Sequence, residues 1–110
     1  MSSNLKYLSL ALVTPGVMLL SFACTESELV FNGIASRRFP VHIQNVARRK
    51  LRMINNALHI EDLRVPPGNK LEKLKGNWSG YYSIRINQQW RIVFRWRQGN
   101  AYEVQIIDYH

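Results

Sequence analysis

The second half of the chain reads as a series of short β-strands, because large apolar residues recur at every second position. The clearest segment places its apolar residues on one face: Trp90, Ile92, Phe94 and Trp96. Its other face carries arginines: Arg91, Arg95 and Arg97. Residues 81–87 alternate in the same way, with Arg85 on the polar face. Gln98-Gly99-Asn100 then predicts a hairpin turn. A last strand follows, with these residues on one side: Tyr102, Val104 and Ile106.

The middle of the chain repeats its apolar residues at helical spacing instead. A helix that begins near Pro40 is predicted by a stripe of five residues: Ile43, Ala47, Leu51, Ile54 and Leu58. Its opposite face is cationic and carries Arg48, Arg49, Lys50 and Arg52. A solvated face and a contact with an acidic partner or nucleic acid both account for these charges. A shorter helix precedes it, with Thr25 and Glu28 as a capping box and Asn32-Gly33 as its end.

Pro66-Pro67-Gly68-Asn69 ends the helical region. The first strand of the second half, around residues 71–75, is irregular or bulged, because its leucines do not alternate cleanly with its lysines. Residues 19–23 form one further strand before the helices. We therefore predict an α+β domain in which two helices pack on a curved antiparallel sheet of about four strands plus this amino-terminal strand. The second face of the sheet is expected to be open and to carry the arginines.

Residues 8–23 form an almost uncharged apolar run that allows two interpretations. In the first, Met18 is the true start, residues 1–17 are an extension outside the native domain, and the domain spans residues 18–110. In the second, the run is a secretory or lipoprotein leader with Cys24 as the lipid acceptor. Pro15-Gly16 interrupts the run, which is also shorter than the roughly 20 residues of a membrane-spanning helix. We favour the first interpretation and expect no membrane association.

The charge balance narrows the class of partner. The chain has 110 residues, enough for one domain, with 15 Lys and Arg against 7 Asp and Glu and a net charge of +8. Such an excess favours a polyanion, such as nucleic acid, or an acidic protein. The single cysteine, Cys24, and three histidines show no metal-ligand spacing, so we expect no metal and no cofactor. A reducing cytoplasm fits this cysteine content best.

The segment Asp108-Tyr109-His110 supplies candidate chemistry at the end of the last strand. Cleavage of RNA without a metal requires a proton acceptor, a proton donor and fixed cations that stabilise the phosphorane. An imidazole such as that of His110 titrates near neutral pH. Lys75 and Arg91 are the best candidates for the fixed cations, since neither belongs to an apolar stripe. Each residue also has a structural alternative: a frayed tail, a half-buried aromatic, an edge-strand lysine or a solvated sheet face.

Several segments in the right order resemble toxins of the HigB type, in the RelE/ParE superfamily of bacterial toxin–antitoxin systems. The segments are residues 62–64, 66–72, 83–87, 89–94 and 108–110. The resemblance covers about residues 18–110. It implies a ribosome-dependent mRNA endonuclease that cuts mRNA in the A site of the 30S subunit and thereby inhibits translation. It also implies a HigA-like antitoxin with a helix-turn-helix domain. The toxin is then expected to associate with operator DNA only through this antitoxin.

Carried over by position, the resemblance implies five catalytic residues: Lys75, Arg91, Asp108, Tyr109 and His110. Five further cations are expected to contact RNA: Lys73, Arg85, Arg95, Arg48 and Arg49. Some relatives have a histidine where this chain has Glu72, so proton transfer is expected to depend more on the carboxyl-terminal cluster. Glu72 is either a weak base or the partner of a lysine. Two alternatives use the same fold: a ParE-like toxin that poisons DNA gyrase, and a basic RNA-binding module without activity. The carboxyl-terminal cluster with Lys75 and Arg91 favours RNA chemistry.

Overall fold

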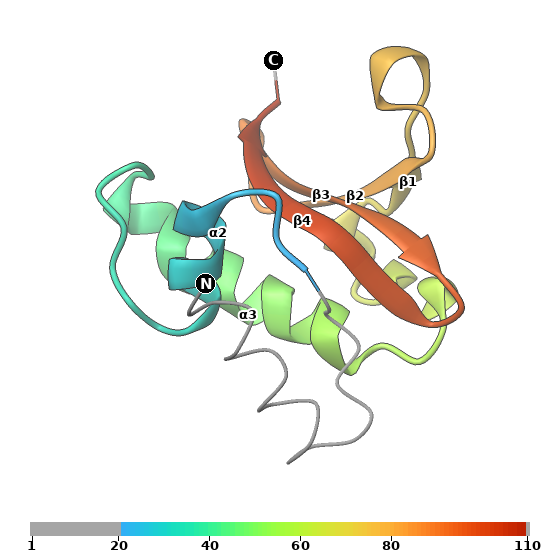
Figure 1. Cartoon of the computed structure of the whole chain (residues 1–110), viewed down its shortest axis with the longest axis horizontal. Helices are drawn as coiled ribbons and strands as arrows, with labels where there is room; N and C mark the ends of the chain where they lie inside the picture. The colour runs from blue at the N-terminus through green and yellow to red at the C-terminus, as the bar shows by residue number, and fades with distance from the viewer. Residues whose placement is uncertain (1–20, 110) are drawn as a thin grey trace.

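In the computed structural model, which describes residues 21–109, two α-helices lie on one side of a curved four-stranded sheet (Figure 1). The helices are α2 (Thr25–Phe31) and α3 (Val41–Asn56). The strands are β1 (Glu72–Lys73), β2 (Tyr81–Arg85), β3 (Trp90–Arg97) and β4 (Asn100–Asp108). They pair in chain order, and every pair is antiparallel. Three short 3₁₀ helices lie between α3 and β2: η1 (Ile60–Arg64), η2 (Pro67–Asn69) and η3 (Gly76–Trp78). The predicted α+β architecture is confirmed.

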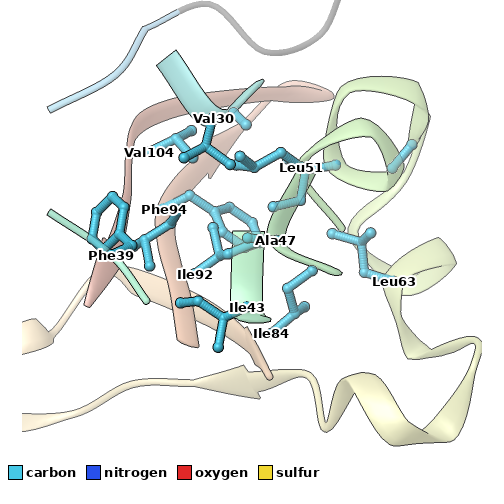
Figure 2. Close-up of a cluster of buried hydrophobic side chains, with 14 residues drawn as sticks. Val30, Phe39, Ile43, Ala47, Leu51, Leu63, Ile84, Ile92, Phe94 and Val104 are labelled. Atoms are coloured by element: carbon cyan, nitrogen blue, oxygen red, sulfur yellow. The ribbon is translucent and has the colours of Figure 1, made fainter. Parts of the chain in front are cut away.

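The core forms where α3 crosses the sheet. The predicted stripe on the helix is buried at Ile43, Ala47, Leu51 and Ile54. It packs with the sheet residues Ile84, Ile92, Phe94 and Val104 (Figure 2). Helix α2 is fixed to β4 by a buried polar contact, in which the Ile106 N–H donates to Ser27 Oγ at 2.9 Å. The 3.6-residue and 2-residue periods thus predict the two surfaces that form the core.

Two details at the helix ends were predicted wrongly. Cys24 occupies the N-cap position of α2 without a side-chain hydrogen bond, and Thr25 is already helical, so the capping box is absent. Helix α3 ends at Asn56 because Ala57 adopts an extended backbone. Leu58 therefore leaves the apolar stripe and is 63% exposed.

Lys50 also differs from its predicted place. It was expected on the cationic face of α3, opposite the apolar stripe, but only 8% of it is exposed, and it lies between core positions of the helix. Arg49 and Arg52 do face solvent. Since a helix turns by about 100° per residue, position 50 lies near the edge of the apolar stripe.

A bulge in β4 changes which of its residues face the core. The pairing of β3 with β4 shifts between Val93 and Arg95, and Glu103 has a φ of 51°. An extra residue in one strand reverses the alternation of side chains beyond it. Ala101 and Val104 are consequently both buried, whereas Tyr102 is only partly buried. The prediction that Tyr102 lies on the same side of the strand as Val104 is therefore wrong.

The second face of the sheet is less open than predicted. Ser83 and Val93, which pair across β2 and β3, are completely buried. Arg91 is 8% exposed, and Leu74, directly after β1, is buried as well. Of the other arginines on this face, Arg85 and Arg95 are partly exposed and Arg97 is exposed.

The amino-terminal strand is not formed in the described residues. Phe22 makes one isolated parallel bridge with Val104, supported by a hydrogen bond of 3.0 Å from the Ala23 N–H to the Val104 carbonyl. The rest of this predicted strand, the boundary at Met18 and the extension over residues 1–17 lie outside the described residues. Among residues 21–109, no helix is both long and apolar enough to cross a membrane.

Candidate active site

A hollow of about 480 Å³ lies where the loop before β1, the turn between β2 and β3, and the end of β4 meet. Its lining residues include Glu72, Arg85, Arg91 and Tyr109. The antiparallel register places Arg85 directly across from Arg91. This hollow, which we call the groove, therefore brings together residues from four separate segments of the chain.

Arg91 is the most firmly held of these residues. Its Nη2 donates to the Lys70 carbonyl at 2.6 Å and lies 3.6 Å from Glu72 Oε1. The guanidinium carbon lies 5.0 Å from the centroid of the Tyr109 ring, a cation–π contact. Burial lowers the pKa of Arg91, while the nearby Glu72 and Tyr109 act in the opposite direction. Because a guanidinium is not deprotonated in proteins even when burial lowers its pKa, the side chain stays a cation of fixed position.

Tyr109 and Asp108 are joined to the β2–β3 turn. The Tyr109 N–H donates to the Gln89 carbonyl at 2.6 Å, and Gln89 Nε2 donates to Asp108 Oδ2 at 3.0 Å. Asn87 closes the same turn by accepting hydrogen bonds from the backbone of Gln89 and Trp90. Tyr109 is 38% exposed and is one of the residues that line the groove. Of the predicted cluster, Asp108 lies beside the groove, Tyr109 lines it, and His110 lies outside the described residues.

The predicted lysines lie on the edge of the sheet. Lys75 is exposed at the N-cap of η3 and is not among the residues that line the groove. Lys73 is exposed in β1, and because neighbouring strand residues point to opposite faces, it points away from the side that Glu72 occupies. The expected pair of Lys75 with Arg91 is replaced by Glu72 with Arg91. Glu72 had been expected to pair, if at all, with a lysine; its partner is an arginine from β3.

Arg95 belongs to a separate cluster further along the same face. Its Nε lies 3.3 Å from Glu103 Oε2, and its guanidinium carbon lies 4.3 Å from the centre of the Tyr81 ring. The Tyr81 hydroxyl donates to Glu103 Oε1 at 2.7 Å, and this bond raises the pKa of Tyr81. Four residues along a strand span about 13 Å, so Arg95 is well separated from Arg91. Its charge is already offset by Glu103.

The predicted RNA contacts Arg48 and Arg49 lie on α3, on the other side of the sheet from Arg85 and Arg91 (Figure 1). The structure therefore places one of the five predicted RNA-binding cations, Arg85, in the groove. The Lys70 carbonyl was missed entirely, because no side-chain pattern marks a backbone acceptor. Among residues 21–109, no three His, Cys, Asp or Glu side chains are grouped so that they could hold a metal ion.

Comparison with known proteins identifies the family of the chain. The family model described as "RelE-like toxin of type II toxin-antitoxin system HigB" matches residues 22–110. Toxin HigB-1 of Vibrio cholerae serotype O1 is 46% identical over 65 residues, which cover 59% of this chain and 68% of that protein. Endoribonuclease HigB of Proteus vulgaris is 32% identical over 93 residues, which cover 84% of this chain and all of that protein (100%).

Solved structures show the same fold. The YoeB–YefM complex from Staphylococcus aureus contains a chain that matches with a TM-score of 0.52 and 25% identity, covering 86% of this chain and 97% of that one. The YoeB dimer from the same organism matches with a TM-score of 0.51 and 23% identity, covering 86% and 98% of the two chains. Together with the family match over nearly the whole described domain, these similarities confirm that the chain belongs to the HigB-like family of RelE-like toxins of type II toxin–antitoxin systems.

Proposed function

We propose that this protein is an endoribonuclease toxin that cuts mRNA in the A site of the ribosome and so arrests translation. The observation that carries the proposal is the groove in which the buried Arg91 guanidinium lies against the Tyr109 ring, beside the Glu72 carboxylate. A fixed cation, a phenol and a carboxylate in one open site are groups that metal-independent RNA cleavage uses. The similarity to the protein named Endoribonuclease HigB supports the same reaction.

In the reaction that we propose, the 2′-hydroxyl of one nucleotide loses its proton and attacks the adjacent phosphorus. The bond from phosphorus to the 5′-oxygen breaks, and that oxygen takes up a proton, which leaves a 2′,3′-cyclic phosphate and a 5′-hydroxyl. Arg91, held by the Lys70 carbonyl, stabilises the charge that develops on the phosphorane. Arg85, paired with Arg91 across the two strands, binds the adjoining phosphate.

The proton transfers are assigned to the end of the chain and to Glu72. Tyr109 has its ring fixed on Arg91 and donates a proton to the leaving oxygen. Asp108 orients this segment through Gln89. The two candidates for the proton acceptor are His110 and Glu72, whose side chain is 53% exposed beside Arg91. Lys75, exposed at the edge of the sheet, contributes a further positive charge when the mRNA backbone passes from the groove along β1.

The partners that we propose are the mRNA-carrying ribosome and a HigA-like antitoxin, both in the cytoplasm, with operator DNA reached only through the antitoxin. Arg48 and Arg49 lie on the helical side of the sheet, so mRNA held in the groove does not account for them. We assign these two arginines, with Lys73 and Arg95, to contacts with the RNA of the ribosome that surrounds the toxin in the A site.

The experiment adds purified protein to ribosomes stalled on a defined mRNA and maps the 5′ ends of the fragments by primer extension. Cleavage that requires ribosomes and is lost in Tyr109→Phe supports the proposal. Tyr102→Phe, which removes a hydroxyl from the partly buried tyrosine of β4, is the matched control. Cleavage of free mRNA at the same rate contradicts ribosome dependence. DNA breaks that depend on gyrase, without new RNA ends, would identify the ParE-like alternative instead.

A further inference from the structure

Lys50 is a buried lysine on α3, on the layer opposite the groove. Only 8% of it is exposed, and burial and the neighbouring Arg49 lower its pKa. Among the described residues, no carboxylate lies within ion-pair distance of it; its ammonium donates instead to Asn69 Oδ1. A buried cation costs free energy unless its hydrogen bonds are made, and an apolar residue of the same volume is often as stable. We therefore expect Lys50 to have a role other than stabilising the fold.

Asn69 links this cation to the loop that forms one wall of the groove. It is completely buried at the end of η2. Its Nδ2 donates to the carbonyl oxygens of Leu63 at 3.0 Å and Val65 at 3.4 Å. Its Oδ1 accepts from Lys50. All polar atoms of this side chain are thus used, so its orientation is fixed from both ends.

Lys70, the next residue, links Asn69 to the candidate active site through its backbone. Lys70 has a left-handed backbone, with φ 49° and ψ 51°, which few residues other than glycine adopt. Its N–H donates to the Pro67 carbonyl at 3.0 Å, and its own carbonyl accepts from Arg91 Nη2 at 2.6 Å. This bond is shorter than the 3.6 Å approach of Arg91 to Glu72. The Lys70 carbonyl is therefore the contact that sets the place of the guanidinium.

We propose that Lys50 is a positioning residue for Arg91. Its ammonium orients Asn69, Asn69 stabilises the left-handed turn at Lys70, and the Lys70 carbonyl holds the guanidinium against Tyr109. Lys50 itself touches no substrate. The proposal deepens the function proposed above, since the effect of Lys50 on catalysis rests on Arg91 acting on the phosphate.

The test compares Lys50→Met with Arg52→Met, which removes a solvent-facing charge from the same helix. The side-chain Nε–H resonance of Arg91, assigned by comparison with Arg91→Lys, reports the guanidinium without any RNA. We expect it to shift or broaden in Lys50→Met and to stay unchanged in Arg52→Met. In ribosome-dependent cleavage, Lys50→Met is expected to lower kcat about tenfold with little change in KM, because an interaction made in the transition state is weakened.

Asn69→Asp is the second variant and serves if Lys50→Met does not fold. It keeps an acceptor for Lys50 but removes the donor to Leu63 and Val65, and it is expected to shift the same Arg91 resonance. An Arg91 resonance that stays at its wild-type position in the folded variants overturns the positioning role. A wild-type protein that does not cut RNA, together with a shifted resonance, overturns the proposed function alone.

Discussion

The guanidinium of Arg91 lies against the ring of Tyr109, with 5.0 Å between the guanidinium carbon and the ring centroid. The contact joins the start of β3 to the residue that follows β4. It places the cation and the phenol of the proposed site in one unit. Substitution of each side chain can therefore show whether it holds the other in place or acts directly on the RNA.

For Tyr109, two substitutions distinguish the role of the hydroxyl from the role of the ring. Tyr109→Phe keeps the ring on Arg91 and removes the proton donor, and we expect the single-turnover cleavage rate to fall about 100-fold. Tyr109→Ala also removes the cation–π contact and is expected to lower the rate further and to move Arg91. Measured on stalled ribosomes, equal rates for Tyr109→Phe and the wild type would exclude the hydroxyl from catalysis.

Arg91→Lys keeps a positive charge but loses the planar donor set that spans Lys70 and a phosphate. We expect cleavage to slow by about 100- to 1,000-fold, the usual effect of removing a donor that stabilises transition-state charge. Binding to ribosomes, followed by co-sedimentation, should change little. A loss of binding that matches the loss of rate would instead assign Arg91 to uniform substrate binding.

Glu72 can be compared with His110 as the proton acceptor. If Glu72 accepts the proton, Glu72→Gln lowers kcat strongly, while His110→Gln has the smaller effect; if His110 does, the order reverses. Glu72→His places an imidazole beside Arg91. We expect that variant to retain cleavage and to gain a dependence on pH near neutrality, since imidazoles titrate there. A pH–rate profile for each variant makes the comparison.

Glu103→Gln tests whether the ion pair with Glu103 weakens the RNA contact that we assign to Arg95. The pair is about half exposed and is screened by solvent, so its loss should change stability little. The freed arginine is expected to raise the affinity for RNA at low salt and to steepen its salt dependence by about 0.7 in the log–log slope. Filter binding over a salt series measures both. Unchanged affinity and slope would show that Arg95 does not reach a phosphate.

Asp62 makes the fold sensitive to acid. Backbone N–H groups of His59 and Leu58 donate to its Oδ2, each at 3.0 Å, and these bonds lower the pKa of the carboxyl. A carboxyl whose pKa is lower in the folded chain stabilises fully above its unfolded pKa, and this stabilisation is lost as pH falls through the folded pKa. Asp62→Asn should therefore melt below the wild type at neutral pH and show a smaller further loss below about pH 4. Thermal denaturation by circular dichroism across that range provides the check.

Local periodicity was sufficient for the core of the fold. Ile43, Ala47, Leu51 and Ile54 are buried as their spacing predicts, and Ile92 and Phe94 of β3 lie in the same core. The wrong predictions concern positions where a single residue departs from the regular spacing of apolar and polar side chains. The bulge at Glu103 turns Tyr102 away from the core and brings a carboxylate to Arg95. The spacing of apolar residues in this strand does not indicate that it contains an extra residue. Lys50 was assigned to solvent because of its charge, although its helical position favours burial.

The site was predictable only in part, because it depends on contacts between distant segments. Arg91 and Tyr109 were identified from residue type and from resemblance, and the structure brings them together. Lys75 was expected beside Arg91, but β1 is so short that the chain turns into η3 before Lys75 can follow Glu72 along the groove. The carbonyl that holds Arg91 belongs to the backbone, and its direction depends on the turn at Lys70.

The brevity of β1 affects how the groove wall can move. Only two residue pairs join β1 to β2, Glu72 with Ser83 and Lys73 with Tyr82, whereas β3 and β4 are paired along almost their whole length. A short ladder at a sheet edge opens at a lower free energy than central strands do. The wall that carries Glu72 is therefore expected to separate from the sheet more easily than the floor formed by β3. The hydrogen bond from Arg91 to the Lys70 carbonyl then anchors the base of this wall, so the guanidinium keeps its place when Glu72 moves.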